Sequence, residues 1–316
     1  MQTRTHRTSA MLRNLTTGAI LAATIAAASG CRVANQALRA DFTDFNTILQ
    51  NNQTQQMLLN LVRMHYRETP LFMQAGSLTA SYESSISADS SASIPAGDAS
   101  SIDIGGGYRF SSKPTISYTP VEGKEYVQQF MAEITPQTFA MLVRAGWPIS
   151  KLGEVLVASV TLESGERLVG RPSAESYPRF REFFKTLKDA EDREELEIVG
   201  RSDGGLDLRA GTVTIGMERL QFRSLFSAMF NASRDVQTPA ALASWAKSTP
   251  GGQEIDVRVS DKPPVDALVY VEYAGSYYSI ANDDIRSKDT LALLMQLSRI
   301  QSGPSAPAPL ITIPAR

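Results

Sequence analysis

Few side chains in this chain of 316 residues have the types and spacing that nucleophilic or metal chemistry needs. Ser244 and Lys247 have the Ser-x-x-Lys spacing of penicillin-binding enzymes, but the companion Lys-Thr-Gly is missing from the sequence. His65 stands in a helical pattern, where a packed or surface role is more common than a catalytic one. One cysteine and two histidines cannot build a Cys/His zinc cluster. The sequence therefore predicts no catalytic, cofactor-binding or metal-binding residue.

Two further motifs have simpler explanations than a binding site. Asp283 and Asp284 are adjacent, so in an extended chain their carboxylates point to opposite faces and form no acid/base pair. They are expected to be loop and cap residues before a final helix that Ser287 caps. Gly105–Gly107 lacks the Lys and the following helix of a phosphate loop, and a bulged or closely approached strand is expected instead.

Cys31 is the one residue for which the sequence predicts a modification. It follows Ala28-Ser29-Gly30, at the end of a weakly apolar run over residues 15–28 that a basic, acid-free start precedes. This arrangement has the three parts of a secretory signal, and the small residues before Cys31 resemble the lipobox of bacterial lipoproteins. The thiol would then carry a diacylglyceryl group after removal of residues 1–30. A transmembrane helix is the alternative, but the run is shorter than the about 20 apolar residues that a span needs.

The predicted location follows from the residue after Cys31. Position 32 is Arg rather than the Asp that would retain such a lipoprotein in the inner membrane, so we expect an outer-membrane anchor with the protein facing the periplasm. Loss of three arginines with the signal changes the formal net charge from −2 to −5. Without a basic excess or basic cluster, nucleic acid is not an expected partner.

Apolar residues at helical spacing predict several helices. The clearest covers residues 178–188, with apolar positions at i, i+3, i+4 and i+7: Phe180, Phe183, Phe184 and Leu187. Residues 33–69 also predict a helix, and whether the polar run Gln50–Gln56 breaks it is left open. Thr135-Pro136 predicts the start of a helix that ends at Gly146. A strand is expected over Glu154–Glu163 and a helix over Leu220–Ser233.

Alternating residues predict the strands. Residues 72–86 and 102–110 alternate as two-faced strands do, and Thr115–Tyr118 after Pro114 is expected to be a further strand. The Ser/Ala/Asp-rich tract Ser87–Ser101 between them is predicted to be a mobile loop. Further hairpins are expected at 196–217, which turns at Asp203-Gly204-Gly205, and at 268–280.

These elements predict an α+β fold of mostly antiparallel sheets with packed amphipathic helices. The domain prediction has four parts: a signal peptide at 1–30, a helix, hairpin and αβ region at 31–165, an αβ region at 166–302, and a Pro-rich tail at 303–316. A faint repeat, with Thr135-Pro136 matching Thr238-Pro239, allows two αβ subdomains. Chance similarity is the favoured explanation, because such caps are common.

Three stretches resemble an uncharacterised family of proteobacterial envelope lipoproteins. They are Gln53 to Phe72, Phe139 to Pro148 and Tyr277 to Gln301, with Arg223-Ser224-Leu225 as a shorter fourth. The family has no assigned reaction, ligand or catalytic residue. The resemblance therefore implies a place in the envelope and no site.

Together these observations predict a non-catalytic interaction or scaffold protein of the cell envelope, anchored in the membrane by lipid and bound to an envelope protein. The segment 71–118 is the candidate contact surface, against the simpler alternative of an ordinary hairpin. Oligomeric state is left open. An envelope hydrolase that uses Ser or carboxylate residues on cell-wall or lipid substrates is the alternative function, and a small-ligand carrier is the third.

Overall fold

A computed structural model describes residues 46–90, 104–245 and 254–301, with the backbone alone over 75–116. Cys31, most of the predicted loop after Ser90 and the Pro-rich tail lie outside these residues. The chain divides into two compact units after Gln53, and the description below concerns the unit that starts at Thr54, together with the helical residues 46–53. Within the described part of the chain, no helix has both the length and the apolarity that crossing a membrane requires.

The predicted α+β fold is confirmed, and every named strand pair is antiparallel. The described strands form a two-stranded ribbon, β1-β2, and three three-stranded sheets with the orders β4-β3-β8, β5-β6-β7 and β10-β11-β9. Their bounds are β1 Met73–Ser90, β2 Ile104–Pro120, β3 Val157–Thr161, β4 Arg167–Val169, β5 Leu196–Gly200, β6 Leu206–Ala210, β7 Val213–Gly216, β8 Leu220–Phe222, β9 Arg258–Ser260, β10 Ala267–Tyr273 and β11 Ser276–Ala281.

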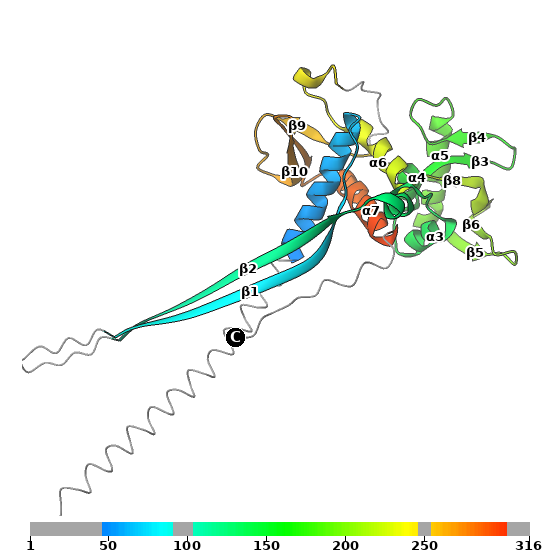
Figure 1. Cartoon of the computed structure of the whole chain (residues 1–316). Coiled ribbons are helices and arrows are strands. Elements are labelled where there is room, and N and C mark those ends of the chain that lie inside the picture. The colour runs from blue at the N-terminus through cyan, green and yellow to red at the C-terminus, as the bar shows by residue number, and fades with distance from the viewer. Residues whose placement is uncertain (1–45, 91–103, 246–253, 302–316) are drawn as a thin grey trace, which may run out of the picture. The chain divides into compact units, whose positions relative to one another are not determined.

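Helices cover the sheets and separate them along the chain (Figure 1). The α-helices are α2 Gly123–Tyr126, α3 Pro136–Arg144, α4 Ile149–Leu156, α5 Tyr177–Asp192, α6 Leu225–Ala232 and α7 Ile285–Gln301. Shorter turns are the π-helix η1 Val127–Met131 and the 3-10 helices η2 Met217–Arg219, η3 Ser233–Asp235 and η4 Ala240–Leu242. The predicted helix at 178–188 is confirmed as α5, and it buries Phe180, Phe184 and Leu187 as its spacing requires.

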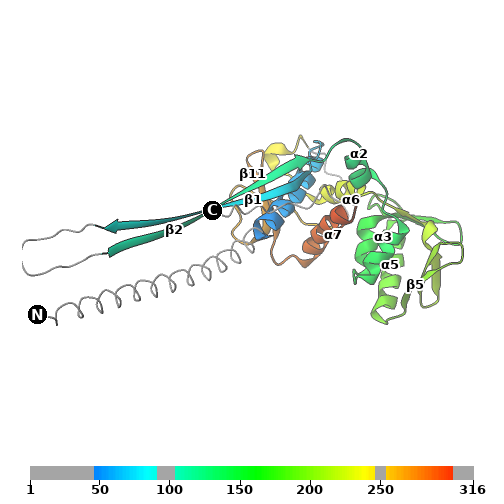
Figure 2. The same ribbon diagram turned by 60° about the horizontal axis from the view of Figure 1, so that its bottom comes forward.

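The two long strands β1 and β2 have 18 and 17 residues and pair with each other alone among the described strands. Figures 1 and 2 show them as two arrows that run side by side. The predicted break at Pro114 is wrong, because β2 continues through it. Gly105–Gly107 lies in β2 in unbroken register opposite Asp89 to Ser87, so the expected strand is confirmed and the expected bulge is not. The loop predicted over Ser87–Ser101 is wrong for residues 87–90, which belong to β1, and its remaining residues lie outside the described ones.

A continuous helix covers residues 46–65, and the polar run Gln50–Gln56 does not break it. Beyond that run, Leu58, Leu61 and Val62 are fully buried. The Asn60 side chain binds the chain that follows the helix, donating to the Leu71 carbonyl at 2.8 Å and accepting from the Leu71 amide at 3.0 Å. These bonds fix the entry of the chain into β1.

One predicted strand and one predicted helix are confirmed with later starts, and one predicted cap is wrong. The strand expected over Glu154–Glu163 begins only at Val157, because Val155 and Leu156 are buried on one side of the helix α4. The helix expected from Leu220 begins at Leu225, after strand β8. Ser287 does not cap α7, since Asp284 accepts its backbone amide at 3.1 Å and so occupies the cap position itself.

The other turn and cap predictions are confirmed. Thr135 accepts the amide of Thr138 at 3.1 Å and caps α3, and Gly146 follows that helix with φ +90°. Gly204 and Gly275 take positive φ in the turns of the two predicted hairpins. The second Thr-Pro pair of the faint repeat, at Thr238, is followed by the single 3-10 turn η4 rather than by an α-helix.

Candidate functional site

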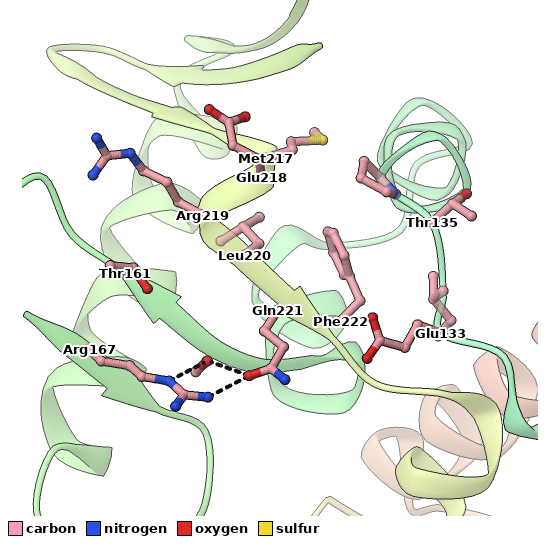
Figure 3. Close-up of a pocket in the computed structure, with 13 residues that line it drawn as sticks. Glu133, Thr135, Thr161, Arg167, Met217, Glu218, Arg219, Leu220, Gln221 and Phe222 are labelled. Carbon is pink, nitrogen blue, oxygen red and sulfur yellow. Dashed lines mark hydrogen bonds between the residues drawn. The ribbon is translucent and has the colours of Figure 1, made fainter. Parts of the chain in front are cut away.

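An open pocket of about 640 Å³ lies along β3 and β8, between the turn before α3 and the turn η2 (Figure 3). Its floor is a chain of polar contacts across the sheet. Arg167 Nε donates to Ser159 Oγ at 3.0 Å, Ser159 Oγ donates to Gln221 Oε1 at 3.1 Å, and Arg167 also donates to Gln221. Sequence analysis missed these residues, because single polar positions on alternating strands give no motif.

The pocket does not activate its serine. A nucleophilic hydroxyl needs a base that accepts its proton, whereas Ser159 donates to an amide oxygen and accepts from a guanidinium that stays protonated. Glu218 in the same wall is held by Arg201, with contacts of 2.9 and 3.1 Å. The arrangement can bind a polar group, but it does not form a hydrolytic set.

A second cluster, the buried polar centre, consists of Lys151, Arg223, Asn231, Glu254 and Thr290. Lys151, Asn231 and Thr290 stand on helices α4, α6 and α7. Arg223 stands just before α6, and Glu254 stands before β9. Lys151 Nζ donates to Thr290 Oγ1 at 3.1 Å, and Thr290 Oγ1 lies 2.5 Å from the Glu254 carbonyl. Asn231 Nδ2 donates to Glu254 Oε1 at 2.8 Å. All five residues are buried.

Arg223 is the main cross-link of this centre. Its guanidinium donates to the carbonyls of Glu154 at 2.6 Å and Val155 at 2.9 Å, and also to that of Gly170. Its backbone amide donates to Leu156 at 2.8 Å. Glu154, Val155 and Leu156 form the end of α4, and Gly170 follows β4. Arg223 therefore donates to carbonyls that have no hydrogen-bond donor within the last turn of the helix.

Glu254 is the electrostatic exception in the centre. Its Oε2 is buried and has no hydrogen-bond partner within the part of the chain that the structure describes. Burial raises the pKa of Glu254 to about 7, against an opposing effect of the Arg223 charge. Burial likewise lowers the pKa of Lys151. None of the five residues lines the pocket along β3 and β8, and their contacts join α4, α6 and α7.

His65 is held in one tautomer by its two contacts. Nδ1 lies 2.9 Å from the Ser233 carbonyl, which can only accept, so Nδ1 carries the proton. Nε2, 2.7 Å from Thr238 Oγ1, therefore accepts from that hydroxyl. Burial lowers the pKa of His65, which favours the same neutral ring. The expected packed role is confirmed, because His65 is buried and connects the helix over residues 46–65 to Ser233 and Thr238.

The remaining sequence candidates are not brought together. Asp284 caps α7, as expected of a cap residue. Ser244 is exposed, while Lys247, its partner in the Ser-x-x-Lys spacing, lies outside the described residues, as does Cys31. Across residues 46–90, 104–245 and 254–301, no three His, Cys, Asp or Glu residues are grouped so that they could hold a metal ion.

Among the described strands, the β1-β2 ribbon is hydrogen-bonded to none of the three three-stranded sheets. In a two-stranded ribbon each strand has one outer edge, where amide and carbonyl groups face away from the partner strand. Such edges bind other strands, and a ribbon of two strands alone is marginally stable in water. Of the described elements, it is therefore the one most in need of an external contact.

No protein-family model, no curated protein and no solved structure matches the chain.

Proposed function

We propose that the protein is a non-catalytic interaction component of the cell envelope, held in the outer membrane by lipid on Cys31 and facing the periplasm. The ribbon of β1 and β2 carries this proposal. It pairs with no other described strand and has 16 register pairs in total, three before and thirteen after one irregularity between Ala75 and Leu78. Its outer edges suit the addition of a strand from an envelope protein or from another copy of the chain.

The chemistry of the pocket supports a binding role over the alternative hydrolase. Ser159 contacts groups that cannot accept its proton in a reaction, and His65 Nε2 is already occupied by the Thr238 hydroxyl. The charged centre that could tune an acid or base, around Glu254, lies inside the helical packing. A hydrolase would need a reacting group that is both accessible and activated.

A ribbon-deleted variant tests the proposal directly. Ala75 and Tyr118 are opposite each other in the register, so a two-residue Asn-Gly turn can replace residues 76–117 and join the strand ends. We expect this variant to keep the circular dichroism of its helices and its acylation, and to lose the protein that cross-linking recovers with the wild type from intact envelopes.

Val265→Ser is the matched surface control, because Val265 is fully exposed and its loss should leave partner recovery unchanged. Intact mass of the extracted protein tests the anchor, with loss of residues 1–30 and added acyl mass as the expected result. Cleavage elsewhere without lipid would contradict the anchor. Equal partner recovery by the wild type and the ribbon-deleted variant would contradict the ribbon as the contact.

A further inference from the structure

We propose that one face of the β1-β2 ribbon inserts into the hydrocarbon layer of a membrane, while its other face remains in contact with water. The inference goes beyond a lipid anchor, because it places part of the protein chain itself in the bilayer. It is carried by the register of the two strands, which sorts their residues into two faces of opposite character.

Residues directly opposite each other in an antiparallel pair share a face, and faces alternate along each strand. Leu78 pairs with Ile116, Ile86 with Tyr108, and Ser90 with Ile104. The face that these pairs define, called here the uncharged face, contains no Asp, Glu, Lys or Arg. Its members are Leu78, Ala80, Tyr82, Ser84, Ile86, Ala88, Ser90, Ile104, Gly106, Tyr108, Phe110, Ser112, Pro114 and Ile116.

The opposite face, called here the charged face, holds all the charged residues of this stretch. They are Glu83, Asp89, Arg109 and Lys113. Between them stand only Ser, Thr and Gly, so no large apolar residue shares this face: Thr79, Ser81, Ser85, Ser87, Gly105, Gly107, Ser111 and Thr115. Separation of this kind over 13 consecutive register pairs, from Leu78 to Ser90, matches a ribbon with hydrocarbon on one side and water on the other.

Lipid is the occupant that the two faces favour, because a ribbon with hydrocarbon on one side needs an uncharged face there, and the described part of that face is long enough. Thirteen residues at about 3.3 Å each extend about 43 Å, and a tilt of about 45° reduces this to about 30 Å across the membrane. That is about the thickness of the hydrocarbon core. The other candidate occupant is the uncharged face of a second copy, which would shield this face from acyl chains as well as from water.

Hydrocarbon also imposes a condition on the edges. Amide and carbonyl groups at the outer edges of β1 and β2 find no water there, so each edge must pair with another strand. The ribbon of a neighbouring copy supplies an identical strand with the same two faces. In this respect the inference rests on the proposed function, which assigns strand pairing to the same edges.

Fluorescence from single cysteines tests the inference on the full processed protein. Cys31 is the chain's one cysteine and its thiol would be acylated, so an introduced cysteine takes the dye alone. Ile86→Cys and Ser112→Cys place an environment-sensitive dye on the uncharged face. Ser85→Cys and Ser111→Cys are their neighbours on the charged face. The protein is measured in vesicles of phosphatidylethanolamine and phosphatidylglycerol, with nitroxide-labelled acyl chains or iodide as quenchers.

We expect quenching by the acyl-chain nitroxide to be at least threefold stronger for the dyes at 86 and 112, and quenching by iodide to be stronger for those at 85 and 111. Alternation between adjacent residues is a result that neither misfolding nor lipid anchoring alone produces. Equal quenching on both faces would overturn the inference. So would dyes at 86 and 112 that neither the acyl-chain nitroxide nor iodide quenches, because this would identify the uncharged face of a second copy as the occupant.

The same preparation separates the two proposals. Vesicles that float with the acylated protein but show no alternation would reject insertion and leave the anchor and its interaction role intact. Alternation in a Cys31→Ser background would support insertion by the ribbon and reject dependence on the anchor. Loss of the cross-linked partner with alternation retained would contradict the proposed interaction role alone.

Discussion

The ribbon and the buried polar centre distribute charge in opposite ways. In the centre, Arg223 and Lys151 are withdrawn from water and donate to carbonyl or hydroxyl groups at 2.6 to 3.3 Å. In the ribbon, Arg109 and Lys113 share a face with small polar residues, and the opposite face has no charge at all. The centre thus uses charge to join distant segments, whereas the ribbon uses it to divide two environments.

This difference separates what folds the protein from what the protein contacts. The centre brings together residues from positions 151 to 290, so its loss should affect the whole fold. The ribbon forms its backbone hydrogen bonds within one local hairpin, so changes in it should affect external contacts instead.

The largest effect is expected from Arg223→Met. The substitution leaves the carbonyls of Glu154, Val155 and Gly170 without their donor and removes the positive charge that faces Glu254. Removing one partner from such a buried set costs about 3–5 kcal/mol, measured as the free energy of unfolding in urea. Arg219→Met is the control, since Arg219 is exposed and donates to one carbonyl; it should cost under about 1 kcal/mol. Similar losses for both would show that Arg223 is not the cross-link.

The next effect is a pH dependence caused by Glu254. Its pKa in the fold is about 7, above the ordinary value of 4.5, so the unfolded chain loses its proton first as pH rises. The stabilisation from protonated Glu254 is therefore full below about pH 4.5 and is lost as the pH rises to about 7. For this shift in pKa, the free energy of unfolding falls by roughly 3 kcal/mol. Glu254→Gln, which keeps an oxygen for Asn231, should lack this slope in urea titrations from pH 4.5 to 7.5. A slope equal to that of the wild type would locate its origin elsewhere.

Parts of this fold could be predicted from sequence because local patterns determine them. The spacing of Phe180, Phe184 and Leu187 fixes α5, and the glycines of the hairpin turns fix their ends. The strand predicted over Glu154–Glu163 is present as β3, but its predicted start is wrong, because Val155 and Leu156 suit a buried helix equally well. Periodicity cannot separate these states in a short apolar run.

The buried polar centre could not be predicted from the sequence, because no local pattern connects its residues. Lys151, Arg223 and Glu254 stand in three separate segments, and each looks like an ordinary surface charge in its own context. Only tertiary packing withdraws them from water. In β1 and β2, the charged residues between positions 79 and 115 all stand at alternate positions, which the sequence already displays. Only the register of β1 against β2 shows that they share one face.

His65 should give a smaller pH effect of the opposite sign. Burial lowers its pKa below 6.5, so the unfolded chain binds the proton first as pH falls. Its contribution is full above about pH 6.5 and is lost toward lower pH. His65→Gln should remove that loss and cost about 1 kcal/mol at pH 7.5, where the contacts to Ser233 and Thr238 are both made. Measurement in the Glu254→Gln background isolates the effect, and an unchanged acid slope there would contradict it.

The smallest effect is expected from Phe110→Ala in the ribbon, compared with the same substitution at Phe130 in the core. Phe130 is 1% exposed and stacks on Phe72 with ring centroids 3.8 Å apart, so its truncation should cost about 3–5 kcal/mol. Phe110 belongs to a hairpin whose strands pair only with each other among the described strands, and its truncation should change the free energy of unfolding in detergent by under about 0.5 kcal/mol. In vesicles, the same variant should weaken ribbon insertion, seen as less acyl-chain quenching of a dye at Ile86→Cys. Equal destabilisation by Phe110→Ala and Phe130→Ala would mean that the ribbon packs as part of the core, and the division between folding and contact would not hold.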